Sequence, residues 1–260
     1  DNLPKVENIL NDITAKIGSL KDSDDLKDLL ELIQNNVEER ANYLASPVEL
    51  EENTLYPMGN YGSAMTPFYS VLALWVGMTL LVSMFSVQAH GEYKPMEVYF
   101  GKMLLFLTIG ITQALIVALG DLYLLGIYCV NPALFVVGIL FASITFVAIV
   151  YSLVSVFGNV GKVVAIILLV LQVAGSGGTF PIQLTPKFFQ VINPYLPFTY
   201  AISFAREAIG GVVQSVLVKD IVIMLIYIVV AILISIFLKK PINNLLSGFT
   251  KKFHESGLGE

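Results

Sequence analysis

The sequence predicts an all-α membrane protein: a polytopic bundle of five transmembrane helices plus a re-entrant or interfacial hairpin, preceded by an extracellular amphipathic helical stalk. Hydrophobic residues make up 56% of the chain and charged residues only 13%, whereas about a quarter of an ordinary soluble domain is charged. The apolar residues also form long runs with polar breaks between them. Most runs approach the roughly 20 residues that a helix needs to cross a bilayer.

The N-terminal segment, residues 1–56, is predicted to be the stalk. Its apolar residues alternate spacings of four and three, which places them on one stripe of a helix: Val6, Leu10, Ile13, Ile17 and Leu20, and after a polar break Leu26, Leu30, Ile33 and Val37. Such a short seam is not stable alone. We expect it to pair with an upstream segment or another subunit; the alternative is an amphipathic helix packed on its own neighbour.

The membrane domain is predicted to span residues 57–260. Its five apolar runs set the expected transmembrane helices at 67–89, 103–128, 132–157, 163–175 and 221–238. Gln113 and Gln172 fall inside these runs, where we expect them to form hydrogen bonds between helices.

Lys and Arg residues near the ends of the runs predict the orientation, because cytoplasmic loops carry the excess of positive charge. One set of connections, together with the C-terminal tail, contains Lys94, Lys102, Lys162, Lys239, Lys240, Lys251 and Lys252. The opposite side has only Lys187, Arg206 and Lys219 near the membrane. We therefore expect a multi-pass protein of the cell membrane with residues 1–66 outside and the C-terminus in the cytoplasm.

The stretch 176–210 is predicted to be irregular at the outer side of the membrane. Glycines end the fourth helix, prolines interrupt the segment after it, and aromatic residues suit the bilayer interface. A re-entrant hairpin or interfacial helix satisfies the rule that irregular backbone at membrane depth lies inside protein or beside water. An ordinary aromatic-rich surface loop is the alternative.

Ionisable groups inside the apolar runs are few, and such groups normally face the bundle interior or water. Asp121 falls in the outer part of the second run, and Arg206 lies at the end of the irregular stretch. Since both fall toward the outer leaflet, we hypothesise that they form a charge pair; the alternative leaves Arg206 facing the outer water.

Enzyme and cofactor motifs are not recognisable. The two histidines, His90 and His254, are far apart in the chain and neither is in a metal-ligand pattern, so we expect no catalytic site, metal or cofactor. No long basic run supports nucleic-acid binding. The chain starts at Asp1 without a signal-like segment, and we expect it to be the C-terminal part of a longer protein.

Two blocks of sequence carry a family resemblance. Residues 44–81, with Ser46-Pro47-Val48, Asn60-Tyr61-Gly62-Ser63, Pro67-Phe68 and Leu74-Trp75-Val76-Gly77, resemble the junction of the YhgE/Pip (phage infection protein) family. Residues 175–211, GSGGTFPIQLTPKFFQVINPYLPFTYAISFAREAIGG, are similar to the segment before the last helix of ABC-2 type exporter permeases, the superfamily that contains YhgE/Pip.

The resemblance implies a six-helix bacterial membrane domain whose first helix lies upstream of Asp1. It implies an external gate in the irregular stretch, with the candidate residues Gly175, Gly177, Gly178, Pro181, Pro186, Pro194, Pro197 and Tyr200. It also implies that the loop 90–102 contacts an ATPase subunit through Glu92, Lys94, Glu97 and Lys102. A solvated connector is the alternative for this loop.

Two functions remain open at this point. The first is a permease-like subunit that exports a lipid-linked, peptide or protein substrate, as a dimer with a separate ATPase. The second is a structural or receptor component of a secretion or envelope complex, as in type VII secretion or phage reception. In both functions membrane lipids are partners of the protein.

Overall fold

The computed structural model describes residues 3–21, 58–87 and 93–255, and all regular elements in these ranges are helices. The chain divides into two units, Asp1–Leu55 and Tyr56–Glu260. The all-α class is therefore confirmed for the described residues.

The first unit contains the described helix α1, Leu3–Lys21. Ile9, Leu10 and Ile13 are exposed on it. These three residues of the predicted stripe are therefore not packed against other described residues. The second half of the predicted stalk, residues 26–44, lies outside the described residues.

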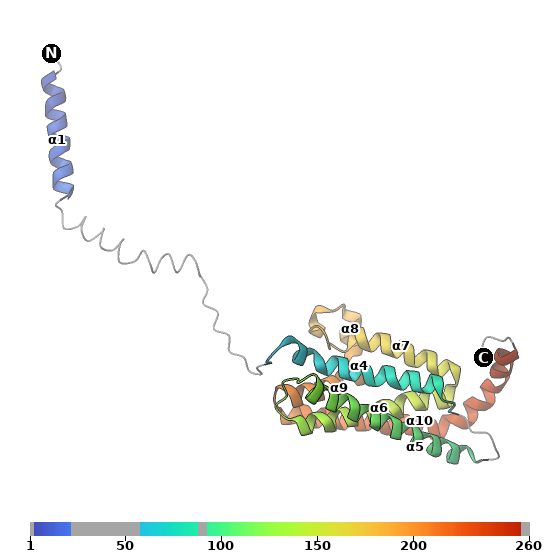
Figure 1. The fold of residues 1–260 in the computed structure, drawn as a ribbon. Coiled ribbons are helices and arrows are strands. Elements are labelled where there is room, and N and C mark those ends of the chain that lie inside the picture. The colour runs from blue at the N-terminus through green and yellow to red at the C-terminus, as the bar shows by residue number, and fades with distance from the viewer. Residues whose placement is uncertain (1–2, 22–57, 88–92, 256–260) are drawn as a thin grey trace. The chain divides into compact units, whose positions relative to one another are not determined.

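The second unit is a bundle organised around one central helix (Figure 1). It comprises α4 (Tyr61–Met84), α5 (Pro95–Leu119), α6 (Pro132–Phe157), α7 (Asn159–Gly175), α9 (Pro197–Gly210) and α10 (Gln214–Glu255). Helix α6 contacts the other five. Near its middle, Phe146 packs edge-on against Trp75 with ring centroids 5.1 Å apart, and Trp75 meets Phe198 in the same way.

Helix α4 begins six residues before the predicted start of the first span and includes Pro67. The Asn60 side chain accepts a hydrogen bond from the Ser63 N–H at 2.8 Å and so caps the first turn. Pro67 lacks the N–H that would bond to the Ser63 carbonyl, yet its ring is buried in the bundle. We expected Pro67 to begin this span. A proline inside a membrane helix is tolerated because neighbouring helices and local adjustments satisfy the freed backbone groups.

Helix α5 begins at Pro95, eight residues before the predicted 103, and its axis continues through a π-helical turn, Gly120–Leu124. Proline suits the first helical position because that N–H would have no partner in any case. The predicted loop 90–102 is therefore mostly the first two turns of a helix.

A tight turn joins α6 to α7. Gly158 has φ +58°, a conformation that glycine adopts without steric cost. A Cβ on Gly161 would collide with the Leu153 carbonyl, so the two helices approach closely where the chain reverses. This turn starts α7 four residues earlier than the predicted 163.

Four helices in the described part of the chain are long and apolar enough to cross a membrane: Tyr61–Met84, Met96–Leu124, Pro132–Phe157 and Gln214–Lys239. Helix α7 has 17 residues and falls below that length. The prediction of a fifth span at 163–175 is thus not confirmed. Helix α10 extends well beyond the predicted 221–238 in both directions.

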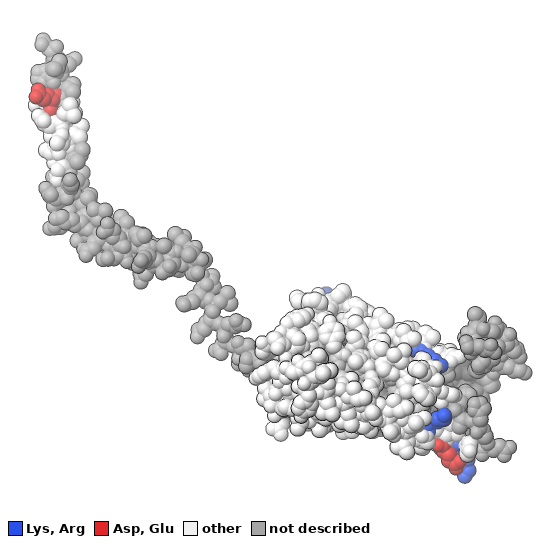
Figure 2. All heavy atoms as spheres, viewed as in Figure 1, with Lys and Arg blue, Asp and Glu red and all other residues white. Residues whose placement is uncertain are grey.

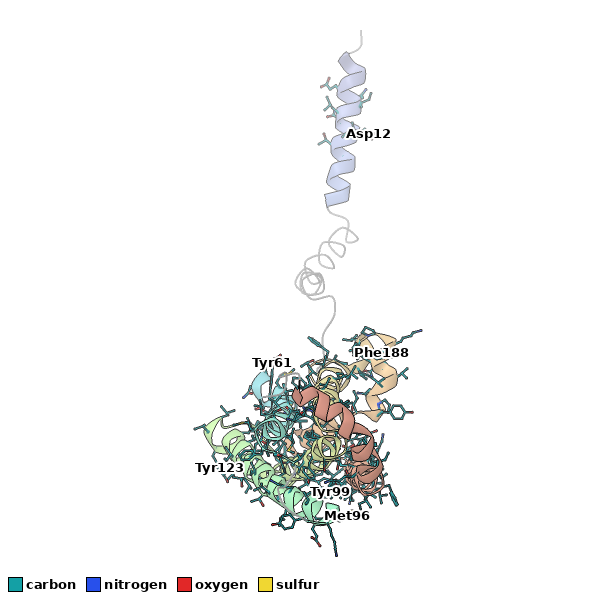
Figure 3. All side chains as sticks on the ribbon, turned by 90° about the vertical axis from the view of Figure 1, so that its right-hand side faces the viewer. Asp12, Tyr61, Met96, Tyr99, Tyr123 and Phe188 are labelled. Atoms are coloured by element: carbon teal, nitrogen blue, oxygen red, sulfur yellow. The ribbon has the colours of Figure 1, made fainter. Side chains whose placement is uncertain are left out.

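The surface of the bundle agrees with a lipid environment. In the face seen in Figure 2, the middle of the bundle is free of charged side chains, and most charges of this unit lie near the end where α5 begins. Figure 3 shows Met96, Tyr123 and Phe188 around the periphery of the bundle. These apolar or amphipathic side chains are all exposed, as expected for a surface that faces acyl chains and the bilayer interface.

Candidate functional site

The segment between α7 and α10 folds into a hairpin of short helices. After α7 come η2 (Ile182–Leu184), α8 (Lys187–Ile192), η3 (Asn193–Tyr195) and then α9. Helix α8 contacts α7, and α9 packs against α4, α6 and α10. The chain therefore turns back on itself beside the end of α7 and then enters the bundle. We call residues 176–210 the outer hairpin, after the side of the membrane that the sequence predicts for it.

The predicted gate residues shape this hairpin. Gly177 has φ +68°, which turns the chain after α7. Pro186 precedes α8, Pro194 lies in the first turn of η3 and Pro197 is the first residue of α9. The prolines thus start new short helices instead of only interrupting an old one.

Arg206 holds the first turn of the hairpin. Its guanidinium, on α9, donates hydrogen bonds to the carbonyls of Gly177 at 3.1 Å and Gly178 at 2.7 Å. A Cβ on Gly178 would collide with the ring of Phe68 on α4. The absence of a side chain at Gly178 therefore lets the turn lie against α4.

A second set of hydrogen bonds closes the hairpin around Asn193. The Asn193 amide donates to the Gly175 carbonyl at 2.7 Å and to Thr199 Oγ1 at 3.1 Å. Tyr200 donates its hydroxyl to the Pro194 carbonyl at 2.7 Å. Tyr200 was among the predicted residues, but Asn193 and Thr199 were not. An Asn-Pro dipeptide is a known turn signal that would have pointed to Asn193.

Both glutamines of the apolar runs join helices, as predicted. Gln172, fully buried on α7, accepts a hydrogen bond from the Phe198 N–H at 3.2 Å. Gln113 on α5 donates to the Ala73 carbonyl on α4 at 2.9 Å, and Gly77 leaves the space for its carboxamide. The interhelical role of both residues is confirmed.

The structure does not bring Asp121 and Arg206 together. Asp121, in the π-helical turn, accepts a hydrogen bond from the Ser70 hydroxyl at 2.5 Å. Arg206 is instead directed to the two glycine carbonyls of the outer hairpin. Sequence position along the helices places both groups toward one end of the bundle but says nothing about which neighbour each helix faces.

The predicted coupling residues fall on the start of α5. The Lys94 N–H donates to the Glu97 carboxylate at 3.3 Å, which closes the first turn, and Lys102 lies within the helix. Glu92 lies outside the described residues. The described side chains of this set thus belong to a helix end and not to a flexible loop.

A polar network that sequence reasoning missed ties this helix end to the bundle. The Tyr99 hydroxyl is 3.0 Å from Ser152 Oγ, and the Tyr151 hydroxyl donates to the Tyr99 carbonyl at 2.8 Å. Lys239 on α10 donates to Ser155 at 2.9 Å, and its ammonium lies 5.2 Å from the centre of the Tyr99 ring. Helices α5, α6 and α10 are therefore joined by hydrogen bonds and a cation–π contact at this end.

Comparison with known proteins identifies the family. The model for the ABC-2 family transporter protein matches residues 2–237. The chain is also 37% identical over 169 residues to the uncharacterised protein YhgE of Bacillus subtilis. That match covers 64% of this chain and 22% of the relative, so the aligned part is a small share of that protein. No solved structure matches.

The family consists of transporter membrane components, which generally work with a separate ATPase and are not themselves catalytic. The bundle agrees with a membrane component, since four helices of the described residues are long and apolar enough to cross a membrane. The chain belongs to the ABC-2 family of transporter membrane proteins and resembles its YhgE/Pip group.

Proposed function

We propose that this chain is a permease-like subunit that exports a lipid-linked, peptide or protein substrate, driven by a separate ATPase. The observation that carries the proposal is the outer hairpin, in which the exposed short helices η2, α8 and η3 are joined by hydrogen bonds to the end of α7 and to the buried α9. A helix bundle that serves only as an anchor needs no such element. A transporter, in contrast, needs one part that moves while the rest stays packed.

The hairpin is suited to act as an external gate because its two ends differ in packing. Helix α9 is largely buried in the bundle, whereas no residue of η2, α8 or η3 is buried. The bonds from Arg206 and Asn193 join the loosely packed side to the buried side. Breaking them releases the short helices and leaves the bundle intact.

The start of α5 is suited to receive the motion of the ATPase. Lys94, Glu97 and Lys102 place charges at this end, and the network of Tyr99, Tyr151 and Lys239 links it firmly to α6 and α10. A push on this helix end is transmitted through packed helices that also contact α9. In this arrangement the end of the bundle at which α5 begins faces the cytoplasm, and the outer hairpin faces the outside of the cell.

Helix α7 completes the membrane domain in this proposal. At about 1.5 Å per residue its 17 residues extend about 25 Å, slightly less than a hydrocarbon layer of about 30 Å. The outer hairpin then occupies the remaining depth on the outer side. A second copy of the chain in a dimer completes the pathway.

Co-purification with an ATPase tests the proposal. The full-length protein is purified from its own cells, and the associated proteins and the ATP hydrolysis of the preparation are measured. We expect a nucleotide-binding subunit in the preparation, and export of the substrate that disappears when this subunit is deleted. Stable assembly with secretion components, and no effect of ATPase deletion on export, contradicts the permease role.

Helix α1 supports a second candidate function. Its exposed apolar residues Ile9, Leu10 and Ile13 offer a stripe for another helix, as a membrane-anchored structural or receptor component requires. Crosslinking through Leu10→Cys distinguishes the two candidates. A partner from a secretion or envelope complex supports the second, and a crosslink only to a second copy of the protein supports the first.

A further inference from the structure

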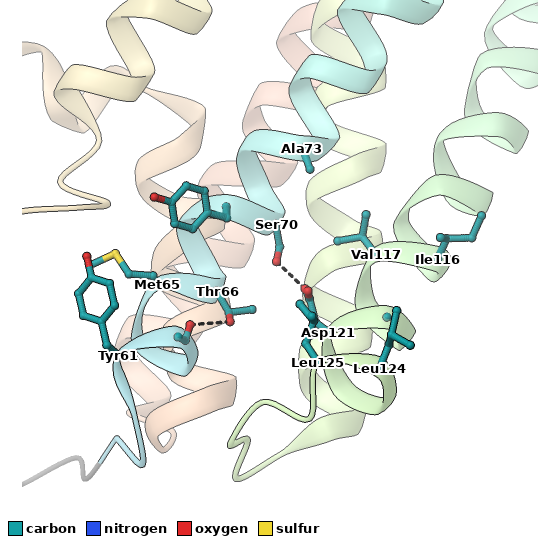
Figure 4. A pocket seen from close by; sticks show the side chains of 13 residues that line it. Tyr61, Met65, Thr66, Ser70, Ala73, Ile116, Val117, Asp121, Leu124 and Leu125 are labelled. Carbon is teal, nitrogen blue, oxygen red and sulfur yellow. Dashed lines mark hydrogen bonds between the residues drawn. The ribbon is translucent and has the colours of Figure 1, made fainter.

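A groove lies between α4 and the end of α5, apart from the outer hairpin (Figure 4). Its volume is about 490 Å³, and residues from Tyr61 to Ala73 line it on one side and residues from Ile116 to Leu125 on the other. Its rim is open to the surroundings, since Tyr69, Leu124 and Leu125 are 58%, 87% and 70% exposed. The groove therefore opens sideways from the bundle, toward lipid.

The π-helical turn builds one wall of this groove. The Leu125 N–H bonds to the Gly120 carbonyl at 2.9 Å, five residues back, so this turn holds one residue more than an α-helical turn. Such single π turns recur at functional sites. Here the turn presents Asp121 to α4, where Ser70 donates to its Oδ2. Ala73 is the last residue of α4 in the lining, and its carbonyl accepts a hydrogen bond from Gln113.

Asp121 lies at hydrocarbon depth. The 24 residues of α4 extend about 36 Å, about 6 Å more than a typical hydrocarbon layer. Ser70 is nine residues after Tyr61, about 14 Å along the helix. If α4 is centred in the bilayer, Ser70 and Asp121 are about 10 Å inside the hydrocarbon layer.

A carboxyl group at this depth requires neutralisation. In the described part of the chain Asp121 is bonded to the Ser70 hydroxyl, and neither Lys nor Arg pairs with it. The charge of this carboxyl is therefore neutralised either by a proton on the carboxyl itself or by a cation that enters the groove.

The dimensions of the groove admit a small amphiphile. The groove runs along α4 from Tyr61 to Ala73, twelve steps of the helix or about 18 Å. A hydrocarbon chain or a small ammonium group, about 4 Å across by carbon–carbon contact distance, fits within this length and volume.

We propose that this groove is a lateral binding site for an amphiphile with an ammonium group. The ammonium binds the Asp121 carboxylate beside Ser70, and the alkyl chain leaves through the open side into the bilayer. Charge complementarity selects an ammonium over a phosphate or a carboxylate. The site is defined by binding and holds whether or not ATP drives transport.

Two substitutions and one matched control test the site in the full-length protein. Asp121→Asn removes the charge and keeps an oxygen that accepts from Ser70. Gly120→Phe adds a ring to the lining of the groove, because Gly120 is one of the lining residues and a Cβ there meets no atom within 4 Å. Gly101→Phe is the control: it lies on the same helix, a Cβ there also meets nothing within 4 Å, and it does not line the groove.

Native mass spectrometry in maltoside micelles, which carry no ammonium group, measures binding of dodecylammonium and of its neutral analogue dodecanol. The natural protein and the Gly101→Phe control should bind dodecylammonium at least about 10-fold more tightly than dodecanol, as expected for hydrogen bonds to a charged group. Asp121→Asn should remove this preference, and Gly120→Phe should remove binding of both compounds.

Equal binding of amine and alcohol by the natural protein, or an unchanged preference in Asp121→Asn, overturns the proposal. So does a Gly120→Phe protein that binds like the Gly101→Phe control. A Gly120→Phe protein that instead dissociates a dimer, with no amine bound to the natural protein, assigns the groove to a second copy and also overturns it. If Gly120→Phe does not fold, the isosteric Asp121→Asn variant decides alone.

Discussion

Replacement of Arg206 by alanine is the most informative perturbation of the outer hairpin. The substitution removes the two hydrogen bonds from α9 to the carbonyls of Gly177 and Gly178. It leaves the buried apolar face of α9 unchanged, including Phe198, Ile202 and Ala205. We therefore expect the hairpin to open locally while the bundle remains folded.

The size of the effect is set by the two bonds. Hydrogen bonds between membrane helices average about 0.6 kcal/mol, and bonds to charged groups in soluble proteins contribute about 1.5–3 kcal/mol. At about 1 kcal/mol each, the pair stabilises the closed hairpin by about 2 kcal/mol, or about 30-fold in its opening equilibrium.

Hydrogen–deuterium exchange of the backbone amides measures this equilibrium directly. The amides of Leu184 and Thr185, which bond within η2, should exchange about 30-fold faster in Arg206→Ala. The amides in the middle of α6 should not change.

Lys187→Ala is the matched control, because Lys187 is an exposed cation of the same hairpin whose side chain makes no hydrogen bond within the described residues. If exchange in the hairpin is the same in Arg206→Ala and Lys187→Ala, then Arg206 does not hold the turn and the gate argument fails.

Three further predictions concern other contacts. Gly178→Ala should destabilise the protein by about 1–3 kcal/mol through overpacking against Phe68, measured as a lower thermal midpoint; an effect no larger than that of Gly101→Ala, which faces open space, contradicts this packing. Tyr99→Phe should cost about 1 kcal/mol by removing the bond to Ser152, and an unchanged midpoint shows that this bond does not stabilise the end of α5. Burial raises the pKa of the Cys129 thiol, so a membrane-impermeant maleimide added outside the cell should label it slowly at pH 7 and faster as the pH rises and the thiolate forms; labelling only from the cytoplasmic side reverses the proposed orientation.

The sequence was most informative where hydrophobic runs are long. The runs 132–157 and 103–128 correspond to α6 and to α5 with its π turn. In lipid, a continuous apolar stretch satisfies its backbone hydrogen bonds within itself only as a helix. The ends of these helices were less predictable. The first run was expected to begin at Pro67, and Pro95 fell within the predicted loop 90–102, but Pro67 is buried within α4 and Pro95 begins α5.

The hairpin was predictable as a break but not in its bonding. Glycine and proline positions mark where the chain turns, and Gly177 and Pro197 do so in the structure. The partners of Asp121 and Arg206 depend on how the helices are rotated about their axes, which apolar runs without a polar face do not reveal. The contact between Tyr99 and Lys239 was also not predictable, because these residues lie far apart in the sequence and no local pattern relates them.

Motion of the outer hairpin when the ATPase acts can be measured as a change of distance between two labels. Spin labels are placed at Lys187→Cys on α8 and at Tyr123→Cys, 81% exposed on the π turn, in full-length protein with Cys129→Ser and its ATPase. We expect the distribution of distances to shift between the nucleotide-free complex and the complex trapped with ATP and vanadate. An identical distribution in both states, in a complex that hydrolyses ATP, contradicts it.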